Sequence, residues 1–514
     1  MNPLPLIDLF VIALYLAGMI GIGIYFSRKK QDTEQFTKAS GHIPGWALGI
    51  SLYATFLSSN TFLGVPGKAF GGDWNAFVFS LSMPFAAWIA ARYFVPFYRK
   101  TGEVSAYTHL ERRFGPWART YAMVCFVLTQ LARMGSIFFG IALTLQALTG
   151  INMSTIMIVS GACIITYTML GGMEAVIWTE VVQGIIKTIG AAVVLGIVIY
   201  GMKDGLSDII AIGREDNKFS LGSYDITDFG SSTFWVIFFY GFFINLNNFG
   251  IDQNYVQRYH TARSGREAAH SIWLCVYWYV PVSLVFFFIG TALYAYFHQN
   301  PELIEAVRNQ AALEKGVAAN TLSPGDYGDK VLPYFMVNKV PTGLLGLIIA
   351  AILSAAMSTI SSGMNASATV FLKDIYQRYI DKNATPKQEM IVLYAATGAI
   401  GVLAIGTGVL MIGVKSILDV WWQLAGIFAG GMLGLFLLGI ISRSSGNAEA
   451  KIATIIGVLA ILWMTFSHLI PDKYLFLRNT LHVNMVIVVG TLAIFLSGVI
   501  ITRLRGKYSP AVDS

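Results

Sequence analysis

Apolar stretches recur along the whole chain and alternate with shorter polar segments. Each stretch has about 20 residues or more, the length that an α-helix needs to cross the ~30 Å hydrocarbon core of a bilayer. The pattern predicts an all-α membrane protein with thirteen transmembrane helices. The expected spans are residues 6–26, 45–70, 74–98, 119–149, 152–170, 173–201, 233–257, 269–297, 338–376, 389–413, 415–440, 449–469 and 482–503.

The second of these spans, residues 45–70, is interrupted at its centre by small and hydroxyl-bearing residues between Ala54 and Thr61. A break in a membrane helix is tolerated where the freed backbone groups line a cavity enclosed by protein, and carbonyl groups exposed there are suitable ligands for sodium. We therefore predict a broken helix at a site for substrate and ion. The alternative is an intact helix whose small residues allow a neighbour to pack closely.

A second interruption lies in the span 233–257, where the polar run from Asn245 to Asp252 follows an aromatic segment. This span comes five after the first broken one, so the two cross the membrane in opposite directions. Corresponding helices of an inverted five-helix repeat have this relation. The two matching interruptions favour a transporter over a simple close-packed bundle.

The composition agrees with a membrane protein. Hydrophobic residues make up 55% of the chain and charged residues only 12%, with a mean hydropathy of +0.62, whereas a soluble domain has about a quarter charged residues. Cys125, Cys163 and Cys275 all lie inside apolar segments. The spacing of the cysteines therefore predicts neither a disulfide framework nor a metal site.

The net charge of +7 arises from loops. Twenty-one lysines and arginines fall in one set of alternate loops, Arg258 among them, and ten fall in the other set. The positive-inside rule then predicts an outside N-terminus and a cytoplasmic C-terminus in a lipid bilayer. No nucleic-acid partner is expected. Of the two long outer loops, 203–231 and 298–337, the second should contain a helix at 301–315, with acids early and Lys315 late.

Three serines share one face of the span 338–376. Ser358, Ser361 and Ser362 stand at i, i+3 and i+4, with Thr359 on the flank. A face of hydroxyl groups suits a small, hard cation. The alternative is that these hydroxyls bond the preceding turn of their own helix and only allow close packing.

One acidic residue, Glu180, is expected about 10 Å inside the span 173–201. A carboxylate at this depth is costly unless it is paired, and such residues are usually functional. Glu180 could complete a cation site with the serine face. A structural network from Glu180 through Gln183 to Lys187 is the competing interpretation.

Arg133 lies near the middle of the span 119–149 and has no acidic neighbour in the sequence. A guanidinium group at this depth needs an anion, and its planar fork matches a carboxylate. We predict that Arg133 binds the carboxylate of a substrate. A pair with a buried acid such as Asp252 or Asp419 is the alternative.

Motifs of common enzymes are missing from the sequence, which contains no HExxH, no GxSxG and no complete nucleotide-binding P-loop. The protein is therefore not expected to be an enzyme, and uphill transport would have to be driven by an ion gradient.

Two motifs resemble those of the sodium:solute symporter family. They are GGMEAVIWTEVVQG at 171–184 and DQNYVQRY at 252–259. The resemblance covers nearly the whole chain and implies a LeuT-type fold with a core of ten helices in two inverted repeats. The implied organisation is an extra helix and loop at 1–44, a first repeat at 45–202, an outer loop at 203–232, a second repeat at 233–440, and two further helices with a tail at 441–514.

Within the family, the stretches around residues 45–70, Arg133 and 355–365 are most similar to the bacterial sodium/sialic acid symporters. This resemblance implies ligands for one or two sodium ions and contacts for an acidic sugar. The main sodium site would use Ala54, Leu57, Ala355, Ser358 and Thr359. A second sodium site would use Glu180, Ser358, Ser361 and Ser362. The sugar would contact Ser58, Thr61 and Arg133, with Phe56, Ser80 and Asn247 also at its site.

Three positions depart from this pattern. Glu180 replaces the aspartate usual in the family, Phe56 stands in place of a threonine, and Ser80 in place of a glutamine. The function implied is sodium-coupled uptake of sialic acid by alternating access. Another organic acid or sugar is the alternative substrate, and a gated cation channel or a membrane sensor are alternatives of other classes.

Overall fold

The computed structural model describes residues 4–28, 33–414 and 416–506, so the predicted loop lysines Lys29, Lys30, Lys415 and Lys507 lie outside the described residues. Over the described ranges, the secondary structure is helical apart from one isolated bridge between Ile43 and Ala262. The α-helices are α1 (Leu6–Ser27), α2 (Thr33–Lys38), α3 (Gly45–Phe56), α4 (Ser59–Gly71), α5 (Val78–Ile89), α6 (Val95–Thr101), α7 (Thr108–Phe114), α8 (Pro116–Thr149), α9 (Met153–Tyr200), α10 (Leu206–Glu215), α11 (Phe234–Ile251), α12 (Gln253–Thr261), α13 (Gly265–His298), α14 (Pro301–Lys315), α15 (Gly328–Lys339), α16 (Leu344–Val370), α17 (Pro386–Leu410), α18 (Ile417–Ile441), α19 (Asn447–Phe466) and α20 (Met485–Leu504).

Eleven helices in the described part of the chain are long and apolar enough to cross a membrane, and the bent pair α3–α4 raises the number to twelve. The segment Met153–Met169, expected as a span at 152–170, is apolar but shorter than the others. It joins the rest of α9 at Gly172, whose positive φ of 59° bends the chain there. The expected count of thirteen is therefore not confirmed.

The break predicted in the second span is confirmed. Helix α3 ends at Phe56 and α4 begins at Ser59, with extended backbone at Leu57 and Ser58. The axes of the two helices differ by 55°. Because the last four carbonyl groups of a helix have no partner within it, the break frees the carbonyls at the end of α3 for other bonds.

The second break is real but shorter than predicted. Only Asp252 departs from helical geometry between α11 and α12, with φ −72° and ψ 123°. Asn245 and Asn247 remain inside α11. The amide of Asn245 donates to Phe79 O and Ser82 Oγ, each at 3.3 Å, so this polar side chain is held without opening the helix.

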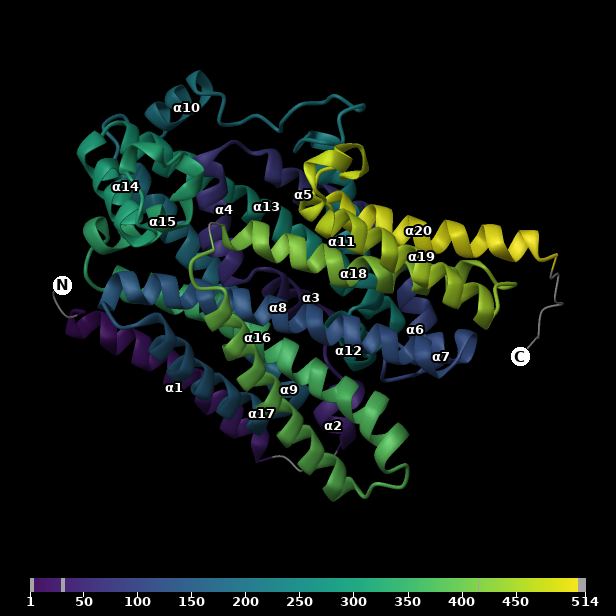
Figure 1. Ribbon diagram of the computed structural model, residues 1–514. Helices are drawn as coiled ribbons and strands as arrows, with labels where there is room; N and C mark the ends of the chain where they lie inside the picture. Colours follow the sequence, from purple (N-terminus) through teal and green to yellow (C-terminus); the bar gives the residue numbers. More distant parts are fainter. Residues whose placement is uncertain (1–3, 29–32, 415, 507–514) are drawn as a thin grey trace.

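The helices form one bundle with distinct ends. Figure 1 shows α10, α14 and α15 at one end and α2, α6 and α7 at the other. The helix predicted at 301–315 is confirmed as α14. The start of α1 lies near α14 and α15, whereas the end of α20 lies at the opposite end (Figure 1). Both long loops thus lie at the same end of the bundle as the start of α1.

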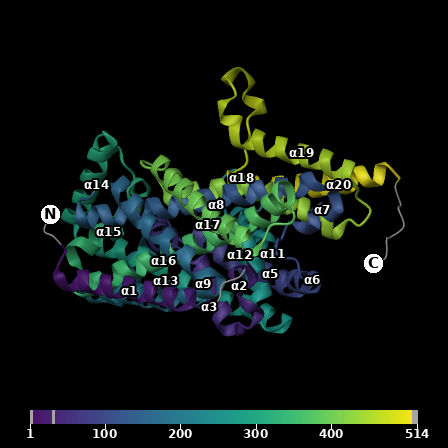
Figure 2. The same cartoon turned by 90° about the horizontal axis from the view of Figure 1, so that it is seen from below.

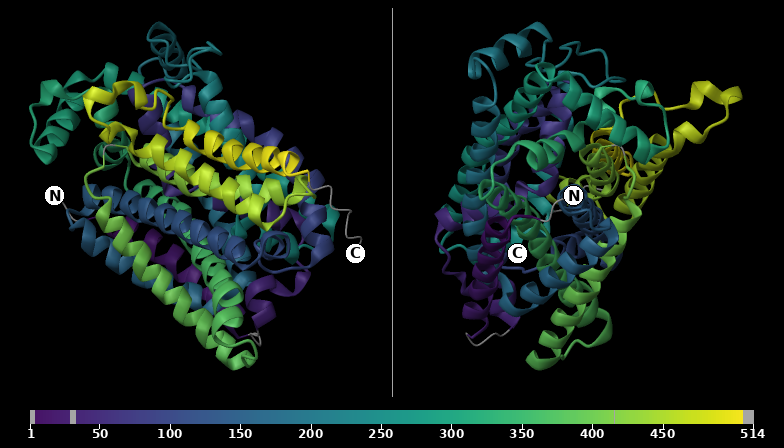
Figure 3. Two further views of the ribbon diagram at one scale, coloured as in Figure 1. Left: turned by 45° about the vertical axis from the view of Figure 1, so that its right-hand side comes forward. Right: turned by 90° about the vertical axis from the view of Figure 1, so that its left-hand side faces the viewer.

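Helices α18 and α20 run alongside each other, with α8 next to α18 (Figure 3). The connection between α19 and α20 stands clear of the bundle in Figure 2. Helix α16 packs against α9, α3 and α4.

Helices α9 and α16 pack tightly at Gly190. A Cβ atom added there would lie 2.3 Å from Cβ of Ala351. We expect Gly190→Ala to lower the free energy of unfolding by about 1–3 kcal/mol, since overpacking forces the helices apart. Gly196→Ala is the matched control on the same helix, because no described atom outside the backbone of that helix lies within 4 Å of its added Cβ. Thermal unfolding of both variants in detergent tests this, and equal melting temperatures would contradict it.

Candidate functional site

The broken end of α3 presents carbonyl oxygens to three other helices. Thr55 O accepts a hydrogen bond from Arg133 Nη2 of α8 at 2.7 Å and from Thr359 Oγ1 of α16 at 3.2 Å. Ala54 O accepts from Ser358 Oγ at 3.0 Å. The hydroxyls of Ser358 and Thr359 also reach Ala355 O, each at 3.3 Å. The five residues predicted for the main sodium site, except Leu57, are thus linked to one another directly or through Thr55.

A lysine completes this cluster. Lys187 Nζ of α9 donates to Ala54 O and to Leu57 O, each at 2.7 Å, and to Ser358 Oγ at 3.0 Å. Lys187 is completely buried. Three of the oxygens predicted to bind sodium are therefore bonded to an ammonium group of the protein itself, and this arrangement does not fit a sodium ion on the same three oxygens.

The residues predicted for a second sodium site surround an arginine. Arg258 Nη2 lies 2.8 and 2.7 Å from the two carboxylate oxygens of Glu180, and 2.6 Å from Ser362 Oγ. Ser362 and Ser51 also donate to the Glu180 carboxylate. Ser361 instead donates to Ser358 O of its own helix at 3.3 Å. The carboxylate is therefore already paired with a positive charge.

The position of Arg258 corrects the sequence interpretation, which counted it among the loop cations. It is 1% exposed on α12. The break at Asp252 redirects the chain, so that α12 carries Arg258 into the bundle. The alternative network from Glu180 to Lys187 is also wrong, because Gln183 donates to the Tyr15 hydroxyl at 3.4 Å and Lys187 points to the break.

Arg133 is 7% exposed and has no carboxylate within ion-pair distance among the described residues. Its guanidinium carbon lies 5.8 Å from the ring centroid of Trp421. The acids that could have paired with it have other partners. Asp252 accepts from Gln130 Nε2 at 3.0 Å, and Asp419 pairs with Lys68 at 2.8 Å.

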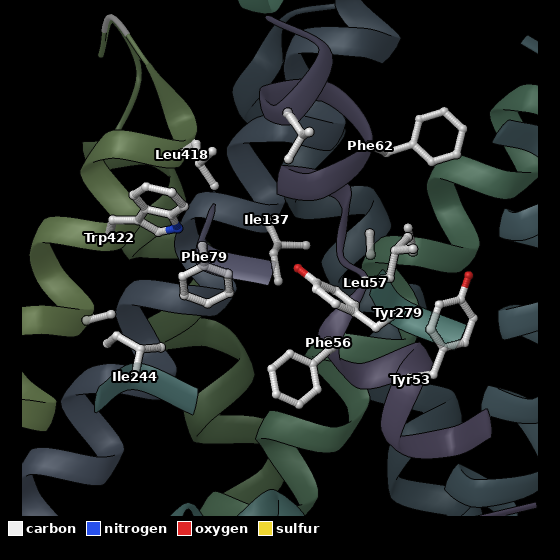
Figure 4. Close-up of a cluster of buried hydrophobic side chains, with 14 of the residues drawn as sticks. Tyr53, Phe56, Leu57, Phe62, Phe79, Ile137, Ile244, Tyr279, Leu418 and Trp422 are labelled. Carbon is white, nitrogen blue, oxygen red and sulfur yellow. The ribbon is translucent and has the colours of Figure 1, made fainter. Parts of the chain in front are cut away.

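The other residues predicted to contact a sugar are buried near the break. Figure 4 shows Phe56 and Tyr279 beside Leu57, with the rings of Phe56 and Tyr279 5.4 Å apart. Ser80 reaches the same part of α13, where its hydroxyl lies 2.8 Å from that of Ser283. Ser58, Thr61 and Asn247 are buried as well.

Several buried polar atoms near these residues have no hydrogen-bond partner within the described part of the chain. Asn60 Nδ2 donates to Ser136 Oγ at 2.6 Å, one turn after Arg133 on α8, but Asn60 Oδ1 accepts no hydrogen bond. Asn247 Oδ1 is also unpartnered. Buried polar groups are normally satisfied, so these two oxygens are available to accept hydrogen bonds from a ligand.

Sequence reasoning missed the contacts of Lys187 and Arg258. Lys187 follows Glu180 by two helical turns, which places both on one face of α9, but the sequence does not tell which neighbouring helix that face meets. For Arg258, the one signal was its place directly after the second polar interruption. The aromatic neighbours of Phe56 had no sequence signal beyond their hydrophobicity.

Comparison with known proteins places the chain in a family. The model of the sodium:solute symporter family matches residues 36–457. The sodium/sialic acid symporters NanT of Aliivibrio fischeri and SiaT of Proteus mirabilis are both 31% identical to the chain. The alignments cover 93% of the chain in each case, with 91% and 92% of the relatives. Human sodium-coupled monocarboxylate transporter 1 is 27% identical over 89% of the chain and 73% of its own length.

A solved structure of a Na⁺-coupled sialic acid symporter in a substrate-bound outward-open state superimposes with a TM-score of 0.85 at 29% identity, covering 99% of both chains. The nucleobase-cation-symport-1 transporter Mhp1 shares the fold alone, with a TM-score of 0.54 at 15% identity over 92% of this chain and 95% of its own. The predicted LeuT-type fold is confirmed, and the matched proteins are transporters, not enzymes. The chain belongs to the sodium:solute symporter family.

Proposed function

We propose that the protein is a sodium-coupled symporter that imports sialic acid by alternating access. The family match and the two sialic acid symporters of 31% identity support this substrate and this ion. The chain covers more than nine-tenths of both relatives, so no large part of them is missing from the comparison.

The observation that carries the proposal is the buried guanidinium of Arg133 beside the helix break, which forms no ion pair with any carboxylate of the described residues. Sialic acid is a sugar with a carboxylate group. A bidentate contact between guanidinium and carboxylate supplies both charge and direction. Ser58 and Thr61, at the start of α4, would bind hydroxyl groups of the sugar, and Phe56 would pack against its ring. The unpartnered Asn247 Oδ1 offers an acceptor on α11.

The orientation that we propose has the N-terminus outside and the C-terminus in the cytoplasm. The excess of basic residues in one set of loops supports it, together with the location of the start of α1 and the end of α20 at opposite ends of the bundle (Figure 1). Lys68 and Asp419, which join α4 to α18, then lie on the outer side of the site.

Uptake into proteoliposomes tests the function. Radiolabelled N-acetylneuraminate should accumulate above its external concentration when sodium is higher outside, and potassium should not replace sodium. Excess unlabelled N-acetylneuraminate should compete, whereas the neutral sugar N-acetylmannosamine should not. Equilibration without accumulation would contradict coupled transport, and stronger competition by another organic acid would contradict the substrate.

A further inference from the structure

The buried side chain of Lys187 bonds to the helix break and to α16, and not to the residues proposed to bind the sugar. Its ammonium group has three N–H donors. The three oxygens within hydrogen-bond distance, from Ala54, Leu57 and Ser358, account for all three. Each bond joins α9 to a different part of the site: the end of α3, the break, and α16.

These oxygens provide the negative counterpart of the ammonium. No carboxylate lies within ion-pair distance of Lys187 among the described residues, because Glu180, on the same face of α9, is paired with Arg258. The carbonyls of Ala54 and Leu57 are free because the helix is broken, and the C-terminal end of a helix carries partial negative charge. The break therefore stabilises a buried cation, and Lys187 supplies one from the chain.

A sodium ion and this ammonium cannot share the three oxygens. Both carry one positive charge, and two like charges a few ångströms apart in a buried site repel strongly. The lone pairs that a metal ion would use are those that accept the N–H groups of Lys187.

We propose that the Lys187 ammonium takes the place of a sodium ion at this site, so that α3, α9 and α16 are held together there by a tethered cation. The consequence of this substitution for transport rests on the proposed sodium-coupled function. The sodium that couples uptake then binds elsewhere than on Ala54 O, Leu57 O and Ser358 Oγ.

Removal of the lysine should create a sodium site. In Lys187→Met, Leu57 O and Ala54 O both lose their bond from the ammonium group, and Ala54 O keeps only the hydroxyl of Ser358 as a donor. Sodium can then bind the two carbonyl oxygens together with Ser358 Oγ. We expect sodium chloride, exchanged against choline chloride at constant ionic strength, to raise the melting temperature of purified Lys187→Met by at least about 2 °C more than that of the wild type at saturation. The double variant Lys187→Met/Ser358→Ala should lose this additional shift.

Thr188→Val is the matched control, because Thr188 bonds the Tyr53 hydroxyl across the same helix pair at 2.6 Å without contributing a cation. Its response to sodium should equal that of the wild type. Equal sodium responses of Lys187→Met and the wild type, or an additional shift that persists without Ser358, would overturn the proposal.

Lys187→Ala is a second variant, with a shorter side chain, for the case that Lys187→Met disturbs packing. For both variants, the yield of folded protein should be higher in sodium buffer than in choline buffer. Failure of both variants to fold even in sodium buffer would also contradict the proposal. These measurements need no sugar. Failure of the wild type to take up N-acetylneuraminate would therefore contradict the proposed function without affecting this result.

Discussion

Arg133→Leu is expected to abolish sodium-driven uptake of N-acetylneuraminate while the protein remains in the membrane. In the proposed complex the guanidinium is the buried partner of the sugar carboxylate. Removing one partner of such a buried charge pair costs about 2–5 kcal/mol, which corresponds to a loss of affinity of roughly 30-fold to several thousand-fold. Uptake at low substrate concentration, with Kd from isothermal titration, measures the effect.

Two controls separate this effect from misfolding. Arg92→Leu makes the same substitution at an exposed position between α5 and α6, and its uptake should match that of the wild type. The methyl ester of N-acetylneuraminate lacks the negative charge, so wild type and Arg133→Leu should bind it equally weakly. An unchanged Kd for the free acid in Arg133→Leu would contradict the role of Arg133.

Arg258→Met is expected to destabilise the protein more than any exposed charge substitution. Glu180 and Arg258 are 0% and 1% exposed, and loss of the guanidinium leaves a buried carboxylate without a counter-charge. Breaking a buried pair in this way costs about 3–5 kcal/mol. Thermal unfolding and the yield of folded protein in detergent measure the loss.

The double variant Arg258→Met/Glu180→Met should regain most of the lost stability, because it removes both charges. Lys68→Met is the comparison at a partly exposed pair, where about 0–1 kcal/mol is expected. A double variant as unstable as Arg258→Met would show that the two charges do not form the stabilising pair.

The sequence was sufficient to predict the first helix break, because a run of small polar residues in the middle of an apolar span is costly in lipid unless it lines an enclosed cavity. It was less reliable for the second break. Asn245 and Asn247 stay helical in the structure, since an asparagine can bond to a neighbouring helix as well as to an opened backbone. Only Asp252, which caps α12 by accepting from Asn254 N, interrupts the chain.

The oxygen atoms of the site were predicted from the sequence, but the cationic side chains that bond to them were not. Burial of Ser358, Ser362 and Glu180 followed from their depth in apolar spans. Lys187 and Arg258 supply the cations because of how α9 and α12 are rotated against α3. This rotation is set by packing across several helices, which the sequence of one helix does not specify. Helical spacing places Lys187 on the same face of α9 as Glu180. The long side chain of Lys187 then brings its Nζ to the break between α3 and α4.

A structure of the protein with bound N-acetylneuraminate would show directly whether Arg133 binds the substrate carboxylate. We predict that the sugar lies between α3–α4 and α8, with its carboxylate within about 3.2 Å of the Arg133 guanidinium. A sugar bound away from the break, or one whose carboxylate contacts another cation while Arg133 remains on Thr55 O alone, would contradict it.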